Sequence, residues 1–174
     1  MSFKITKLDI PDVLLIETTV REDNRGFFME TWKRSEFEKV GIPPFVQENR
    51  SFSIKDVVRG LHYQAAPQGQ GKLVRCIRGE IFDVAVDIRE GSPTRYQWVS
   101  AVLSDKNHHE LYIPDGFAHG FCVTSDSAEV VYNCTSEYSP EHERGILWND
   151  PVINITWPTT SPVLSPKDEV YAPL

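Results

Sequence analysis

Cysteine is scarce in this chain, basic residues are outnumbered by acidic ones, and long apolar runs are missing. Its 174 residues hold three cysteines, Cys76, Cys122 and Cys134, each alone in an apolar stretch. Isolated cysteines of odd number predict buried free thiols in a reducing compartment. The formal net charge of -7 argues against a nucleic-acid partner. Without a membrane-length apolar segment or a basic and apolar leader, the sequence predicts a cytoplasmic protein with no membrane partner.

Several common catalytic motifs are also missing. The sequence contains no glycine-rich phosphate loop, no dinucleotide fingerprint, no Gly-x-Ser-x-Gly and no Cys-x-x-Cys. Redox, acyl-transfer and nucleotide-hydrolysis chemistries therefore lack their usual parts.

Length and composition predict one domain over residues 1–174. The chain is 40% hydrophobic and 25% charged, and its length is close to that of an average domain with a buried core. No internal repeat, low-complexity stretch or linker interrupts it. We expect residues 158–166, rich in proline and serine, to form an irregular tail on the body of this domain.

Short β-rich runs separated by turns predict an all-β fold. Alternation is clearest over 81–88, where an apolar face opposes one that carries Asp83 and Asp87 and predicts a partly polar interior. One helix is expected over 35–40, with Ser35 as N-cap, Glu38 as its capping-box partner and Gly41 as the stop. Such elements favour a jelly-roll barrel, or double-stranded β-helix, of the cupin-like type with a few short helices. The predicted strands are 13–20, 26–32, 72–79, 81–88, 96–103, 110–114, 119–124 and 128–135.

Two histidines lie in distinctive strings, His62 in RGLHYQ and His119 in PDGFAHGF. The second string has the Pro-x-Gly-x-x-His form typical of small cupin-type barrels. A metal-binding cupin would need a second histidine at the position of Gln64, and a catalytic metal normally takes three protein ligands. The sequence therefore predicts proton chemistry and no metal site.

The residues alone leave several roles open. His62 is favoured as a general base, since imidazole titrates near neutral pH, whereas His119 is favoured for structural or ligand-positioning duty. Tyr132 is a core residue, or a general acid if its strand face is the barrel lumen. Each remaining candidate is by itself expected to be a surface charge. These are Arg25, Glu30, Arg59, Lys72, Asp83, Glu143 and Lys167.

Nine ordered blocks from about residue 3 to about residue 170 resemble the dTDP-4-dehydrorhamnose 3,5-epimerase family. The blocks are RGFFME, FVQEN, VVRGLHYQ, QGKLVRCIRGEIFDVAVDIREGSPT, LYIPDGFAHGF, AEVVYNCT, ERGILWNDP, ITWP and LSPKDE. This resemblance implies a jelly roll without cofactor or metal that acts on a dTDP-4-keto-6-deoxyhexose. It also implies a homodimer whose N-terminal strands are exchanged between subunits.

The resemblance also implies catalytic roles. His62 matches the base, Asp168 the carboxylate that orients it, and Tyr132 the acid on the opposite face of the sugar. Lys72 matches the cation that stabilises the enolate oxygen. Asp83 is a reserve partner for His62 or Lys72.

Further positions match substrate-binding residues of the family. Tyr138 matches the aromatic residue that stacks on thymine, and the N-terminal position of Arg25 and Glu30 implies service to the neighbouring subunit's site. The sequence departs from the family's pattern at two positions, with Glu137 before Tyr138 where tyrosine is common and Arg50 where histidine is common. These departures leave room for an altered base, sugar or phosphate preference. The matching positions are Arg25, Glu30, Gln47, Asn49, Arg59, His119, Tyr138, Glu143 and Lys167.

Other functions remain open at this stage. A single-carbon epimerase or a ketoisomerase on a related dTDP-4-keto sugar would use much of the same machinery. A metal-dependent oxygenase is disfavoured by Gln64. A non-catalytic sugar-binding module would not need His62, Lys72, Tyr132 and Asp168 together.

Overall fold

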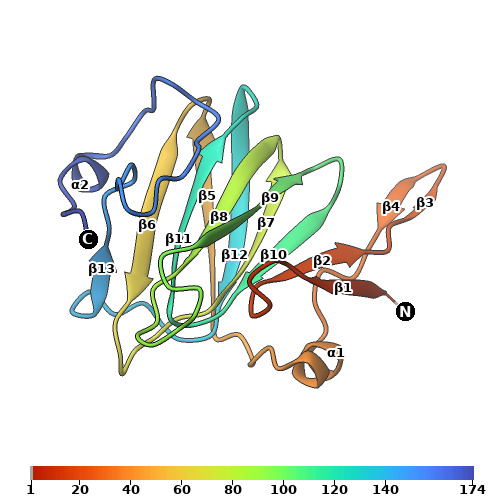
Figure 1. The fold of residues 1–174 in the computed structure, drawn as a ribbon. Coiled ribbons are helices and arrows are strands. Elements are labelled where there is room, and N and C mark those ends of the chain that lie inside the picture. The colour runs from red at the N-terminus through yellow and green to blue at the C-terminus, as the bar shows by residue number, and fades with distance from the viewer. Residues whose placement is uncertain (1) are drawn as a thin grey trace.

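Two antiparallel sheets form the body of the computed structural model, which describes residues 2–174 (Figure 1). One sheet has six strands in the order β1-β2-β10-β7-β12-β5, and the other has five in the order β13-β6-β11-β8-β9. The hairpin of β3 and β4 extends from the side of the body (Figure 1). The strands are β1 Phe3–Lys7, β2 Leu14–Thr18, β3 Arg21–Asp23, β4 Gly26–Phe28, β5 Gln47–Ile54, β6 Val58–Gln64, β7 Lys72–Arg78, β8 Glu80–Asp87, β9 Trp98–Ser104, β10 His109–Ile113, β11 Phe117–Val123, β12 Ser127–Cys134 and β13 Glu143–Gly145. This mostly β, cupin-like jelly roll confirms the predicted fold class.

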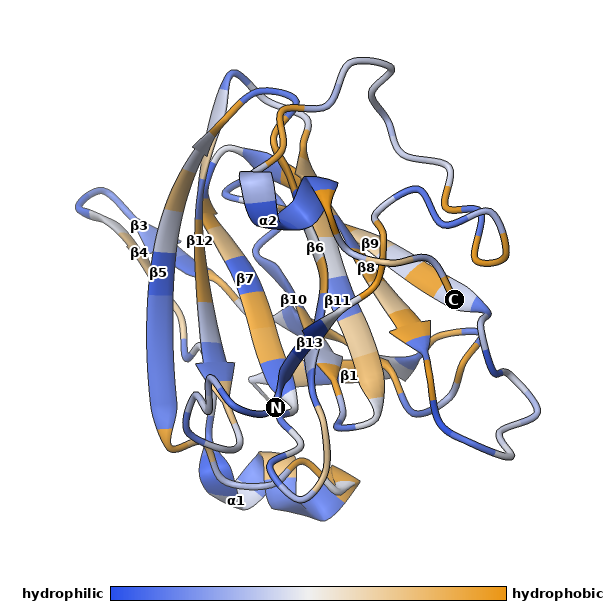
Figure 2. Cartoon of the chain, turned by 90° about the vertical axis from the view of Figure 1, so that its left-hand side faces the viewer, coloured by the Kyte–Doolittle hydropathy of each residue, from blue (hydrophilic) through white to orange (hydrophobic). Residues whose placement is uncertain are grey.

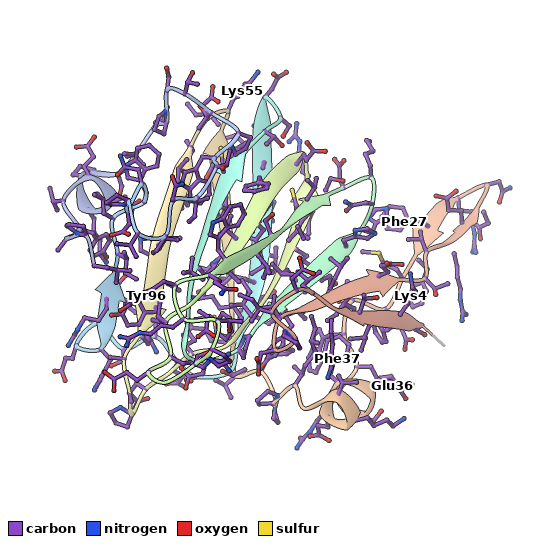
Figure 3. The ribbon with its side chains drawn as sticks, viewed as in Figure 1. Lys4, Phe27, Glu36, Phe37, Lys55 and Tyr96 are labelled. Carbon is purple, nitrogen blue, oxygen red and sulfur yellow. The ribbon has the colours of Figure 1, made fainter. Side chains whose placement is uncertain are left out.

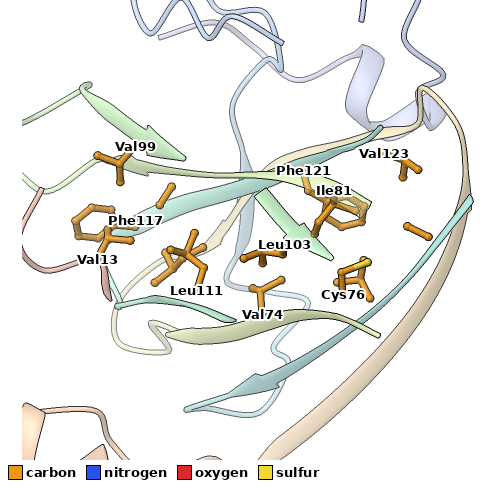
Figure 4. Packing of buried hydrophobic residues seen from close by; sticks show 14 of the residues in the cluster. Val13, Val74, Cys76, Ile81, Val99, Leu103, Leu111, Phe117, Phe121 and Val123 are labelled. Atoms are coloured by element: carbon orange, nitrogen blue, oxygen red, sulfur yellow. The ribbon is translucent and has the colours of Figure 1, made fainter. Parts of the chain in front are cut away.

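The main hydrophobic core lies between the two sheets. Val74 of β7, Ile81 of β8, Leu103 of β9 and Leu111 of β10 are fully buried there, with Phe121 of β11 (Figure 4). Close packing of such side chains is the main source of the sandwich's stability, because it removes apolar area from water.

Strand β8 shows the predicted alternation. Ile81 points into the core between the sheets, whereas Val84 and Val86 pack in a second cluster on the other face. That outer cluster is covered by chain that includes Ile155 and Trp157. Both faces of β8 are therefore buried, and Asp83 and Asp87 lie fully inside the fold.

The predicted strands at the start of the chain were partly wrong. Strand β4 ends at Phe28, well short of residue 32, and β1, β3 and β5 were not expected. Strand β5 has the sequence QENRSFSI and carries few apolar residues, so its period-two pattern is weak. Polar residues recur on its inner face because that face borders a cavity, where Gln47, Asn49 and Ser51 lie.

The helix is real, but its predicted start was wrong. Helix α1 (Arg34–Phe37) follows Lys33 as N-cap and continues into the 3₁₀ turn η1 (Glu38–Val40). Neither N-cap side chain, that of Lys33 or that of Phe37, makes a capping hydrogen bond, so packing and not capping sets the position of the helix. Phe37 is buried edge-on against Phe3 of β1, with 5.1 Å between the ring centres. Figure 3 shows Phe37 at this helix. The stop at Gly41 is confirmed, since its φ of 84° is left-handed.

The chain has no regular helix or strand over 158–165 and then forms helix α2 (Pro166–Glu169), which begins at the last residue of the predicted irregular tail. Val163 bridges Val57 and ties this segment to the body. Pro166 starts the helix, where its missing N–H costs nothing, and the Ser165 hydroxyl accepts from the Asp168 amide. Asp168 is thereby fixed on a single turn of helix.

The three cysteines are free and buried, which confirms the prediction made from their surroundings. Across residues 2–174, every helix is too short and too polar to cross a membrane.

Candidate active site

A cavity of about 340 Å³ opens between the two sheets. Figure 2 shows β5, β12 and β7 on one side and β6, β11 and β8 on the other, with β13 and α2 at the opening between them. Most of the predicted site residues line this space. The lining residues are Gln47, Asn49, Ser51, Arg59, His62, Tyr63, Gln64, Gln70, Lys72, His119, Phe121, Tyr132, Tyr138 and Glu143.

His62 and His119 lie on neighbouring strands of the five-stranded sheet. They face each other in the register between β6 and β11. The two backbones come together at Gly60, where an added Cβ would lie 2.6 Å from the Cα of Gly120. Gly60 also has a φ of +136°, which L side chains rarely adopt. These glycines therefore allow the strand contact that places two imidazoles in one cavity wall.

His62 is paired with Asp168. Its Nε2 lies 2.6 Å from Oδ1 of Asp168, and Oδ2 accepts from the Ser165 hydroxyl at 2.8 Å. Burial alone would raise the pKa of Asp168, but the hydrogen bonds from His62 and Ser165 outweigh it and lower the pKa. An ionised carboxylate only accepts, so Nε2 carries the proton and the lone pair of neutral His62 is on Nδ1.

His119 has its own carboxylate. Its Nε2 lies 2.7 Å from Oδ1 of Asp83, which is fully buried. Asp83 was predicted as a reserve partner for His62 or Lys72, and for His62 this was wrong. The register of β11 on β8 sets Asp83 beside the His119 strand, while the C-terminal helix supplies the partner of His62.

Lys72 is a buried cation in the cavity wall, with 9% of its surface exposed. Burial lowers its pKa, and electrostatic interactions with Cys134, Asp83 and Glu143 oppose that shift. Burial likewise raises the pKa of Asp83, and its Oδ2 lacks a hydrogen-bond partner among residues 2–174. Buried groups with such shifted pKa values cluster at functional sites.

Tyr132 lines the cavity, so this face of its strand is the lumen face. It lies on β12 opposite Asn49 of β5. Burial raises the pKa of Tyr132, with a smaller contribution from Cys134. The phenol is therefore protonated at neutral pH and can donate a proton.

A hydrogen-bonded group forms the outer rim. The Tyr138 hydroxyl donates to Glu143 at 2.7 Å, and the Lys167 ammonium lies 2.5 Å from the same carboxyl oxygen. Burial works against these bonds, but together they lower the pKa of Glu143. The Tyr138 amide donates to Gln47 at 2.8 Å. This rim combines an exposed aromatic ring with charges of both signs.

Two predicted residues lie away from this cavity. Arg25 is at the tip of the β3–β4 hairpin, exposed and paired with Asp23 at 2.6 Å. Glu30 follows the hairpin and accepts a hydrogen bond from Ser2. The hairpin projects from the far side of the body, where Phe27 is also found (Figure 3).

Sequence reasoning missed some lining residues that strand alternation would have found. Ser51 is two positions after Asn49 on β5, and Phe121 is two positions after His119 on β11. Gln70 lies in a loop and could not be found in this way. Gln64, where a metal-binding cupin would have histidine, holds the loops through bonds to Gln68 and Ser139.

Within the described residues, no group of three or more His, Cys, Asp or Glu side chains is placed to hold a metal ion. Each cavity histidine instead contacts one carboxylate.

Fold and cavity together define a cupin-like jelly roll whose cavity holds two histidine–carboxylate pairs. The chain belongs to the dTDP-4-dehydrorhamnose 3,5-epimerase family, whose model matches residues 7–174. This confirms the family resemblance found in the sequence.

Individual relatives support the assignment. The chain is 57% identical to the dTDP-4-dehydrorhamnose 3,5-epimerase of Shigella flexneri, over 94% of this chain and 92% of that one. It is 40% identical to a dTDP-4-dehydrorhamnose 3-epimerase of Streptomyces niveus, over 95% of this chain and 81% of the relative. The crystal structure of a 3,5-epimerase from Legionella pneumophila in complex with dTDP-4-keto-L-rhamnose superimposes with a TM-score of 0.95 at 47% identity, covering 98% and 92% of the two chains.

Proposed function

We propose that this enzyme inverts carbons 3 and 5 of dTDP-4-dehydro-6-deoxy-D-glucose and forms dTDP-4-dehydro-L-rhamnose. The product would serve dTDP-L-rhamnose or related deoxysugar biosynthesis. One observation carries the proposal: His62 of β6 and Tyr132 of β12 belong to different sheets and line the same cavity. A base and an acid in opposing walls suit inversion, in which the proton leaves one face of the ring and returns to the other.

The first chemical step is proton abstraction next to the ketone. Carbons 3 and 5 both flank carbon 4, so loss of either proton gives an enolate with its charge on the same oxygen. Nδ1 of His62 takes the proton, and Asp168 stabilises the imidazolium through Nε2. One base and one oxyanion site can therefore serve both carbons.

The enolate requires a positive charge close to its oxygen. Lys72 has this role because it is the buried cation of the cavity wall. Removing such a charge typically costs about 3 to 4 kcal/mol of transition-state stabilisation.

Tyr132 completes the inversion. Its phenol donates a proton to the carbon from the second face, and the tyrosinate is then reprotonated from solvent. The imidazolium of His62 loses its proton to solvent, so the enzyme returns to its starting state and the net reaction is an isomerisation.

The nucleotide would occupy the outer rim. Tyr138, half exposed at 52%, offers a ring on which thymine can stack. Arg59 and Lys167 supply cations for the diphosphate, while His119, Gln47, Asn49 and Glu143 provide further polar contacts.

The site is completed by a second copy of the chain. Arg25 and Glu30 match substrate-binding positions of the family but lie far from their own cavity, so we assign them to the site of the neighbouring subunit in a homodimer with exchanged N-terminal strands. The exposed Phe27 and Phe28 of the hairpin support this, since aromatic side chains are enriched in interfaces. Residues 1–174 then act as one catalytic domain, and the free thiols support a cytoplasmic location.

A single-carbon epimerase is the alternative, and solvent deuterium separates the two. The enzyme is incubated with dTDP-4-keto-6-deoxyglucose in deuterated water, and label is located by NMR and mass spectrometry. Deuterium at both carbons 3 and 5, with inversion at each, is expected. Label at one carbon would support the narrower activity, and label at neither would refute proton abstraction from this substrate.

A further inference from the structure

We propose that Tyr171 positions the His62 base by covering its hydrogen bond to Asp168. The inference rests on the proposed function, because it concerns the group assigned as the base. Tyr171 is not a cavity-lining residue, so it acts through His62 and not on the sugar.

The two rings are in edge-to-face contact. Their centres are 5.8 Å apart, and their planes meet at 64°. The distance is within the 4.5–7 Å range at which aromatic rings pack favourably. His62 is partly exposed at 32% of its side chain, whereas Asp168 is buried at 3%. Tyr171 therefore packs against the more exposed member of the pair.

Gly145 makes room for this ring. It lies opposite His62 in the register between β13 and β6. A Cβ at Gly145 would be 2.3 Å from Cζ of Tyr171 and 2.4 Å from Cε2, so the ring rests directly on the glycine backbone. Its φ lies outside the left-handed range, so the position requires glycine for space and not for backbone conformation.

Tyr171 is held from both sides along the chain. Before it, helix α2 carries Asp168 itself. After it, the Ala172 carbonyl accepts from the Leu147 amide at 3.1 Å, and the Leu174 amide donates to Asp150 at 2.7 Å. Backbone bonds on both sides of Tyr171 therefore fix the segment that carries its ring.

The same ring also neighbours the rim. The Lys167 ammonium lies 6.0 Å from the ring centre, at the distance limit for a cation over an aromatic face. The Tyr171 ring thus neighbours both His62 and the Lys167 end of the Lys167–Glu143 ion pair.

Exclusion of water is the physical effect that matters here. Water competes for the Asp168 carboxylate and for the Nε2 proton, and it weakens a charge-assisted bond by raising the local dielectric. With the ring in place, the bond keeps His62 in one tautomer and one orientation, with Nδ1 free. Without it, the imidazole can rotate and share its proton with solvent.

The test compares Tyr171→Ala with Tyr171→Phe, which keeps the ring. Val170→Ala is the matched control, since the neighbouring Val170 is 78% exposed. NMR measures solvent exchange of the His62 Nε2 proton in the substrate-free enzyme, and steady-state assays give kcat and KM.

In Tyr171→Ala we expect exchange to be at least about tenfold faster and kcat to fall by roughly tenfold to a hundredfold, with KM nearly unchanged, because a small misplacement of a catalytic group costs up to about 10²-fold. Tyr171→Phe and Val170→Ala should match the wild type in all three quantities. If Tyr171→Ala does not fold, Tyr171→Leu replaces it in the same comparison.

Gly145→Ala gives an independent route to the same effect. Its new methyl group displaces the Tyr171 ring, so this variant should show fast exchange and low kcat. Added to Tyr171→Ala, it should cause little further loss, because the two changes remove one interaction.

The proposal would be overturned if Tyr171→Ala had the exchange rate and kcat of the wild type. It would also be overturned if Tyr171→Phe or Val170→Ala lost proton protection and kcat as much as Tyr171→Ala does. A rise in KM alone would place Tyr171 in substrate binding and would also overturn it. The exchange measurement needs no substrate. Protection of the His62 proton in an enzyme that labels neither carbon would therefore refute the proposed function and leave this inference standing.

Discussion

Nε2 of His62 and Oδ1 of Asp168 are 2.6 Å apart, although 106 positions separate the two residues in the chain. The strand β6 provides the imidazole and the short helix α2 provides the carboxylate. The carboxylate receives a second bond from Ser165, the cap of its own helix. Both the direction of the imidazole and the charge of its partner are consequently set before any substrate binds.

Replacing Asp168 by Asn tests this pairing through stability. The pKa of Asp168 is lowered in the folded protein, so in acid the unfolded chain binds a proton that the folded chain does not. The free energy of unfolding of the wild type should exceed that of Asp168→Asn by about 1 to 3 kcal/mol at neutral pH, as is typical for hydrogen bonds to charged groups. This advantage should persist above pH of about 4 and disappear as the pH falls through the lower, folded-state pKa.

Urea unfolding of both proteins from pH 3 to pH 7 measures the difference. A gap that does not change with pH would show that the Asp168 charge contributes nothing.

Tyr132→Phe should separate the two proton transfers. His62 remains, so deuterium exchange next to the ketone continues, while protonation from the second face loses its donor. General acid catalysis contributes about 10² to 10⁴-fold, so we expect product formation to fall by that order. Exchange and product formation are followed by NMR in the same sample.

His62→Ala is the matched control and should abolish exchange at both carbons. If Tyr132→Phe lost exchange and product formation to the same degree, Tyr132 would not be the second-face acid.

The fall of kcat/KM at high pH, its alkaline limb, should report the deprotonation of Lys72. The pKa of Lys72 is lowered by burial, and its charge is needed at the enolate. Activity should therefore fall as the pH rises through a value below the ordinary lysine pKa of about 10.4. Tyr132 cannot produce this limb, because its pKa is raised.

Lys72→Arg keeps the charge at high pH and should lose the limb, at a reduced kcat. Lys72→Met should lower kcat by about 10² to 10³-fold at every pH. An unchanged limb in Lys72→Arg would assign it to another group.

Glu110 allows a prediction away from the active site. Its carboxyl group is 1% exposed, and neither oxygen has a hydrogen-bond partner in the described part of the chain. Burial raises its pKa to about 8, so the folded protein keeps a proton that the unfolded chain releases above pH of about 4.3. The contribution of Glu110 to the free energy of unfolding should thus decline as the pH rises from about 4.3 to about 8.

Glu110→Gln removes this decline. The stability of the variant relative to the wild type should therefore rise with pH, and the difference should become constant above pH of about 8. Thermal and urea unfolding between pH 5 and pH 9 provide the measurement. A variant that gained nothing over this range would place the folded pKa of Glu110 near its ordinary value.

Local sequence accounted for the strands whose faces differ in polarity. Strand β8 was predicted correctly because Val84 and Val86 alternate with Asp83 and Asp87. Strand β5 was not predicted because its inner face borders a cavity and is polar. The start of α1 was also missed, since burial of Phe37 outweighs a favourable cap at Ser35.

The candidate site divides in a similar way. Motif likeness identified His62, Lys72, Tyr132 and Asp168 by position. It did not reveal that Asp83 pairs with His119, because that contact depends on the register of β11 on β8. Tyr171 was not found from the sequence, since nothing local connects it to His62.

What the sequence determined by itself was the all-β class, the family and the residue types available for proton transfer, because these follow from strand periodicity and from ordered motifs. Tertiary structure alone decided which carboxylate joins which imidazole and which strand faces meet in the cavity. The physical reason is that hydrogen bonds and buried charges depend on distances of a few ångströms between residues far apart in the chain, and these distances exist only after the sheets have packed.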